Sequence, residues 1–171
     1  MIDPPNMAAL EALAKTIQEN PNKAQARYAP ARATIQGGFK CQVKGPSGEH
    51  IETDMPLAMG GSAAGPNPGW FFRASFAACC STVIAMQAAR LGIKVTKIEV
   101  TVGGNGDQRG LLGLDDNVSA AHTEIRTDVQ ISAENATPEQ LKEVVNWALE
   151  HSPVGRTVRD APMNVVNIVV V

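Results

Sequence analysis

The sequence lacks the features that mark several large classes of protein. Its 15 basic and 17 acidic residues nearly cancel, and no cluster of Lys or Arg stands out, which argues against an electrostatic nucleic-acid partner. Its three cysteines are an odd number and two of them are adjacent, so they do not form a disulfide framework. A reducing cytoplasm is therefore the simplest compartment for the protein.

Targeting and membrane signals are also missing. Residues 1–5 contain no basic start followed by an apolar run, so we expect no signal peptide. A run of about 18 apolar residues occurs only in one predicted helix, where Arg73, Gln87 and Arg90 interrupt it. We therefore expect no membrane span.

Little in the chain suits a metal or a nucleotide. His50, His122 and His151 lie far apart in the sequence, and none has a Cys or a carboxylate at ligand spacing, so we expect no metal. The glycine-rich run 103–110 follows a strand, but its spacing is not G-x-G-x-x-G and no helix opens after it. A solvated loop is the better interpretation, and we expect no cofactor.

Periodic segments are present along most of the chain. Capping residues and apolar stripes predict helices over 6–20, 68–91 and 138–151, with a short turn of helix over 154–159. Alternating patterns predict strands over 27–36, 95–102, 124–132 and 165–171, and a hairpin over 38–53. This order indicates an α+β fold with two helices against curved antiparallel sheet. The apolar stripe of helix 6–20 is thin, so we expect an arm over 1–22 and a main domain over 23–171.

The helix after Asn67 carries a pair of cysteines. Asn67 is a preferred N-cap, Pro68 falls at the first helical position, and Gly92 suits the C-cap. Successive helical residues turn by about 100°, so Cys80 points away from Cys79. The residues that share the face of Cys79 are Phe72, Ser75, Phe76, Val83 and Met86. The thiol of Cys79 is therefore either a small core hydrophobe or a nucleophile in an apolar pocket.

Several short motifs together resemble the OsmC/Ohr family, the osmotically inducible and organic-hydroperoxide-resistance proteins. The resemblance covers residues 27–171. Its motifs are Asp54-Met55-Pro56, Gly60-Gly61, Gly65-Pro66-Asn67-Pro68, Ala77-Ala78-Cys79, Leu91-Gly92-Ile93, Arg109-Gly110 and His151-Ser152-Pro153-Val154.

This resemblance implies an intertwined homodimer, in which curved antiparallel sheets wrap around two central helices and the site lies at the subunit boundary. Active members are thiol peroxidases. Cys79 matches their attacking cysteine, and Ser152 stands at the position of their second cysteine. We therefore expect Cys79 and Ser152 to approach each other between the two long helices, beside a pocket lined by Phe72, Phe76 and Met86.

The chain departs from the family pattern at two positions. Ser152 cannot form a disulfide, so the usual recycling step is absent. Gly69 stands where family members commonly carry a Glu that braces an Arg near the thiol. The residues that could supply such an Arg are Arg27, Arg32 and Arg73.

Three functions follow from this pattern. The first is a peroxidase that reduces small or lipophilic organic hydroperoxides at Cys79, with an external thiol, Cys80 or Cys41 resolving the sulfenic acid. The second is a non-catalytic dimer whose pocket binds an apolar ligand. The third is a redox sensor, which the sequence supports least because it shows no effector segment.

Overall fold

The computed structural model describes residues 2–162 and 164–170, and the chain divides into two compact units. We call Asn6–Ala74 the meander unit, and Met1–Pro5 with Ser75–Val171 the core unit. The meander unit holds a three-stranded antiparallel sheet and the core unit a two-stranded one. This α+β architecture confirms the expected fold class. The division expected from the sequence, an arm over 1–22 and a main domain over 23–171, has other boundaries than these two compact units and stays a prediction.

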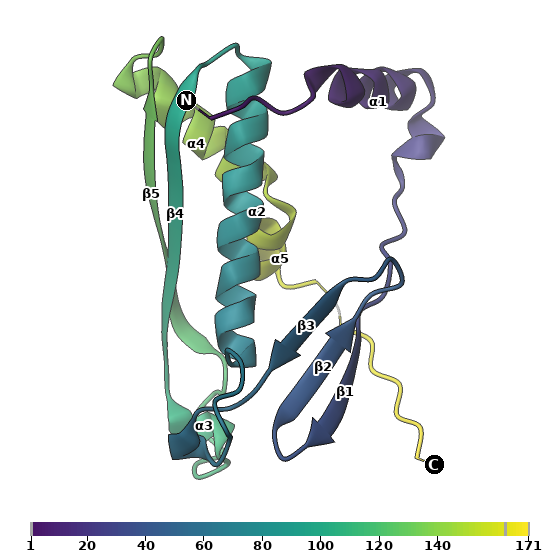
Figure 1. Ribbon diagram of the computed structural model, residues 1–171, viewed down its shortest axis with the longest axis vertical. Coiled ribbons are helices and arrows are strands. Elements are labelled where there is room, and N and C mark those ends of the chain that lie inside the picture. The colour runs from purple at the N-terminus through teal and green to yellow at the C-terminus, as the bar shows by residue number, and fades with distance from the viewer. Residues whose placement is uncertain (1, 163, 171) are drawn as a thin grey trace. The chain divides into compact units, whose positions relative to one another are not determined.

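In the meander unit, a capped helix precedes three short strands (Figure 1). Helix α1, Met7–Glu19, begins where the Asn6 side chain accepts the Ala9 N–H at 3.4 Å, and one 3-10 turn, η1 (Pro21–Ala24), follows it. The strands are β1 (Arg32–Gly37), β2 (Lys40–Lys44) and β3 (His50–Thr53). The predicted helix over 6–20 and hairpin over 38–53 are confirmed. The strand predicted over 27–36 starts only after Pro30, which has no N–H for a sheet ladder.

Asp54 organises the connection between β3 and the long helix. Its buried carboxylate accepts the Ser62 hydroxyl at 2.7 Å and the backbone N–H groups of Met55, Ser62 and Ala64 at 2.8, 2.9 and 3.1 Å. These hydrogen bonds, led by that from the Ser62 side chain, lower the pKa of Asp54 to about 2. The charged carboxylate therefore holds the loop that contains the 3-10 turn η2 (Leu57–Met59).

Helix α2, Pro68–Arg90, forms as its flanking residues predict. The Asn67 side chain accepts the Trp70 N–H at 2.9 Å, and Gly92 takes a φ of 66°, which a glycine adopts without strain. By length and hydropathy α2 is the one helix of the described chain that could cross a membrane. Core helices of soluble proteins meet the same test, and Ile84 and Ala88 of α2 are buried in the core unit.

The core unit builds its hydrophobic centre from two helices and two long strands. Strands β4 (Val95–Gly106) and β5 (His122–Ala133) pair side by side (Figure 1), and α4 (Pro138–His151) and α5 (Pro153–Asp160) follow them. Helix α4, predicted over 138–151, begins with a capping box of Thr137 and Gln140. The buried core comprises Val83, Ile84 and Ala88 of α2, Val95 of β4, and Val144 and Ala148 of α4. Alternate residues of β4 and β5 pack against this core, as a half-buried sheet requires.

Two predictions about strands are wrong. The run Gly103–Gly106 extends β4 because each residue pairs with β5, and the single-turn helix α3 (Gln108–Leu111) follows it, so the solvated loop is shorter than expected. Residues 164–170 form no strand, and Val171 lies outside the described residues. A strand needs a neighbour for its hydrogen bonds, and the β-branched pattern of this segment has none within the described part of the chain.

Candidate functional site

Ser152 lies at the junction of α4 and α5, where it serves as the N-cap of α5. Its hydroxyl oxygen accepts the Gly155 N–H at 3.2 Å, and Pro153 occupies the first helical turn. The side chain is fully buried. Ser152 Oγ also donates to Cys79 Sγ of α2 at 3.2 Å. The structure therefore brings together Cys79 and Ser152, which lie 73 positions apart in the chain.

Cys80 also contacts the Ser152 hydroxyl. Its Sγ donates to Ser152 Oγ at 3.6 Å, and its side chain is 0% exposed, whereas Cys79 is only partly buried. Burial is the largest effect on the Cys80 thiol, and it raises the pKa of this group. Of the two adjacent cysteines, Cys79 is therefore the less buried residue.

The contact between Cys80 and Ser152 was not foreseen from the sequence. Because successive helical residues turn by about 100°, the side chains of Cys79 and Cys80 point in different directions, as expected. Ser152 nevertheless contacts both sulfurs. Ser152-Pro153 has the same cap-then-proline pattern as Asn67-Pro68 and Thr137-Pro138. That pattern could have located Ser152 at a helix start.

An apolar cavity of about 250 Å³ adjoins Ser152. Its lining residues are Phe76, Ile125, Thr127, Leu149, Gly155, Val158 and Arg159. Gly155 lines the cavity and also lies close to the hydroxyl, since a Cβ at this position would be 3.0 Å from Phe76 Cε2 and 3.2 Å from Ser152 Oγ. Of the expected pocket residues, Phe76 lines this cavity, whereas Met86 packs against the core cluster. Phe72 belongs to the meander unit.

Charged side chains at the rim of this cavity neutralise one another. Arg159 donates to both oxygens of Glu150 at 2.7 and 2.9 Å, and Arg156 contacts Glu150 at 3.2 Å and Asp160 at 2.7 Å. Arg159, with Arg156, lowers the pKa of Glu150. The arginines that the sequence offered as activators of the thiol, Arg27, Arg32 and Arg73, belong to the meander unit.

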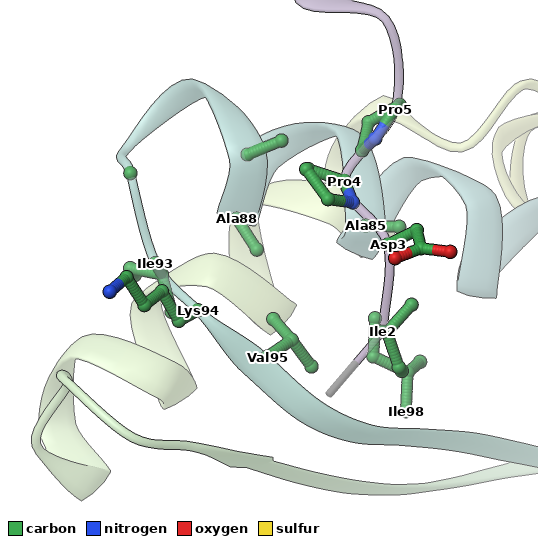
Figure 2. A pocket seen from close by; sticks show the side chains of 12 residues that line it. Ile2, Asp3, Pro4, Pro5, Ala85, Ala88, Ile93, Lys94, Val95 and Ile98 are labelled. Carbon is green, nitrogen blue, oxygen red and sulfur yellow. The ribbon is translucent and has the colours of Figure 1, made fainter.

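A second cavity, of about 300 Å³, lies farther along α2 in the core unit (Figure 2). Ala88 on its wall is about 14 Å from Cys79 along the helix axis, at the usual rise of 1.5 Å per residue. Its aliphatic lining includes Ile2, Ala85, Ala88, Ile93, Val95 and Ile98. The N-terminal segment closes one side, where the Ile2 N–H donates to the Val95 carbonyl at 3.2 Å. Within residues 2–162 and 164–170, no three His, Cys, Asp or Glu side chains cluster to hold a metal ion.

Comparison with known protein families gives one match for this sequence. The sequence model of the OsmC-like protein family matches residues 60–166. No curated protein is similar enough to the sequence to count as a match.

Solved structures share the fold at low sequence identity. An OsmC-like protein from Mycoplasma pneumoniae is 16% identical with a TM-score of 0.67, over 79% of this chain and 89% of that one. An organic hydroperoxide resistance protein from Elizabethkingia anophelis is 21% identical with a TM-score of 0.59, over 80% and 91% of the two chains. A putative organic hydroperoxide resistance protein from Vibrio cholerae is 24% identical with a TM-score of 0.53, over 81% and 90%.

Proposed function

Because this chain belongs to the OsmC-like family, we propose that it reduces organic hydroperoxides at Cys79 in defence against oxidative stress. The observation that carries the proposal is the 3.2 Å hydrogen bond from the buried Ser152 hydroxyl to the sulfur of Cys79, a residue that is only partly buried. A donor aimed at sulfur favours the thiolate, which is the nucleophilic form. The names of the similar structures from Elizabethkingia anophelis and Vibrio cholerae, organic hydroperoxide resistance proteins, agree with this chemistry.

The reaction uses one cysteine of this chain. The Cys79 thiolate attacks one oxygen of ROOH, the O–O bond breaks, and the leaving alkoxide takes a proton to give ROH and a Cys79 sulfenic acid. An external thiol then attacks the sulfenic sulfur, releasing water and forming a mixed disulfide. A second thiol displaces Cys79 and leaves as the oxidised disulfide. Ser152 contributes no sulfur to this cycle, so the reductant acts directly on Cys79.

The test of this function is hydroperoxide consumption by the purified protein. Cumene hydroperoxide with dithiothreitol should be consumed by the wild type and by the control Cys41→Ser, which alters a thiol on β2 of the meander unit. Cys79→Ser should abolish the consumption. Equal consumption by Cys79→Ser would end the proposal.

The same proposal includes a homodimer. Every buried hydrophobic side chain among the described residues lies in the core unit, whereas Ile35, Phe39 and Ile51 of the meander unit are 62%, 53% and 39% exposed. The apolar side chains of residues 165–170 are 70% to 91% exposed. A second copy would cover these surfaces, and it would offer the C-terminal segment a sheet edge to pair with.

Solution measurements test the dimer independently of the chemistry. Light scattering should give twice the mass of the 18.0 kDa chain. Ile35→Glu should shift the protein toward the monomer because it places a charge on the exposed apolar face. A monomeric wild type would contradict the dimer.

We also place the protein in the reducing cytoplasm, since all three cysteines are free thiols.

The aliphatic cavity in Figure 2 favours a second candidate, a dimer that binds an apolar ligand without catalysis. A fluorescent hydrophobic probe should then bind the wild type and Cys79→Ser equally. Ala89→Phe should reduce its binding by filling the cavity that Ala89 lines. If Ala89→Phe binds the probe as well as the wild type does, the proposal of an apolar ligand in this cavity is wrong.

A further inference from the structure

Resting on the proposed function of Cys79, we propose that Cys80, Ser152 and Cys79 form a directed hydrogen-bond chain. In this chain Cys80 is a positioning residue that orients the Ser152 hydroxyl, and Ser152 donates its only proton to the Cys79 sulfur. Ser152 then stabilises the anionic sulfur directly, as a catalytic residue in the place of the second cysteine of the family.

The hydrogen-bonding capacity of Ser152 sets the direction of the chain. A serine hydroxyl has one proton to donate and two lone pairs that accept. The Gly155 N–H and the Cys80 thiol donate to this oxygen at 3.2 and 3.6 Å. Both acceptor positions are therefore occupied, and the hydroxyl proton is left for Cys79 Sγ at 3.2 Å.

Burial keeps Cys80 in its donor role. Its side chain is 0% exposed, and burial raises the pKa of its thiol, so Cys80 retains its proton. Cys79 is only partly buried, so its surroundings differ from those of Cys80. The two adjacent cysteines therefore have different tasks, one as donor and one as acceptor.

The backbone around Ser152 prevents the hydroxyl from turning away. Ser152 is fully buried, so water does not compete for its proton. Gly155 brings its N–H close because it has no side chain, and a Cβ there would press on Phe76 Cε2 at 3.0 Å. The hydroxyl is thus preorganised before any peroxide arrives, which is how fixed dipoles stabilise charge most effectively.

The experiment is the pH dependence of Cys79 alkylation by iodoacetamide, followed by peptide mass spectrometry in the absence of peroxide. Ser152→Ala and Ser152→Gly should move the midpoint of the rate profile to higher pH by about one unit, or about tenfold in rate below the midpoint. The glycine variant is included because glycine preserves the helix cap better than alanine. The matched control is Ser81→Ala, whose hydroxyl donates to the Ala77 carbonyl of the same helix.

Cys80 is tested by a pair of variants. Cys80→Ala should slow alkylation below the midpoint by about threefold, since it removes one neutral hydrogen bond. Cys80→Ser should restore the wild-type profile because its hydroxyl still donates. Equal effects of Cys80→Ala and Cys80→Ser would indicate a packing change and overturn the role of Cys80.

The proposal fails if both Ser152 variants keep the wild-type midpoint. Its failure is distinguishable from that of the proposed function, because alkylation needs no peroxide. A wild type that consumes no hydroperoxide but whose alkylation profile depends on Ser152 would support the hydrogen-bond chain and refute the peroxidase.

Discussion

Replacing Ser152 by cysteine should convert the site into a disulfide-forming pair. Ser152 Oγ lies 3.2 Å from Cys79 Sγ and is held there by the N-cap of α5. A sulfur at this position is therefore within side-chain reach of the sulfenic acid that a hydroperoxide forms on Cys79. We expect Ser152→Cys to form a disulfide between positions 79 and 152, with release of water, when one equivalent of hydroperoxide is added.

The stabilisation from this bond follows from the length of the loop that it closes. The two positions are 73 apart in the sequence. Loop-closure entropy for a separation of this size gives about 4 kcal/mol of stabilisation relative to the reduced protein. A chain of this length gains about 2–4 °C in melting temperature for each kcal/mol, so the oxidised variant should melt about 8–16 °C higher than its reduced form.

Thermal melting with and without dithiothreitol measures this difference in a single variant. Mass spectrometry of the non-reduced protein should show the loss of two hydrogens and a peptide linking positions 79 and 152. The matched control is Ser81→Cys, which lies on α2 but on the side away from Cys79. It should form no such link.

One outcome would refute the reasoning about the site. If Ser152→Cys keeps a free thiol at position 152 while Cys79 is trapped as a sulfenic acid, the two side chains do not approach as described. A link between positions 152 and 80 in place of 79 would likewise reverse the roles of the two adjacent cysteines.

Three further predictions concern stability. Because the pKa of Asp54 is lowered, its carboxylate stabilises the fold fully above pH 3.8, the ordinary pKa, and this stabilisation is lost as the pH falls through about 2. The difference in melting temperature between wild type and Asp54→Asn should therefore decrease as the pH falls from 3.8 to about 2. A gap that is constant from pH 5 to pH 2 would contradict this. Thr137→Ala removes the capping box with Gln140 and should cost about 1 kcal/mol in denaturant unfolding, and no change would show that the box does not stabilise α4. Ile84→Ala should cost about 2–5 kcal/mol and Ile84→Val about 0.5–1.5 kcal/mol, because Ile84 is 0% exposed, and equal costs would place it outside the core.

Much of the secondary structure could be predicted because its causes are local. Asn67, Thr137 and the alternation along 95–102 act within a few residues, so the starts of α2 and α4 and the position of β4 follow from short patterns. The wrong predictions concern segments whose state depends on partners. The run Gly103–Gly106 joins a strand because β5 lies beside it and accepts its hydrogen bonds. Residues 164–170 form no strand because no strand of the described chain lies beside them.

The family and the α+β class follow from the sequence itself, through motifs whose order needs no coordinates, and the same motifs led us to expect that Cys79 and Ser152 approach each other. Only the tertiary structure decided that Cys80 joins them. Its contact with Ser152 spans 72 positions and requires α2, α4 and α5 to meet around one buried hydroxyl. Local propensities do not encode such a meeting, because it arises when the apolar faces of these elements bury one another in the core unit.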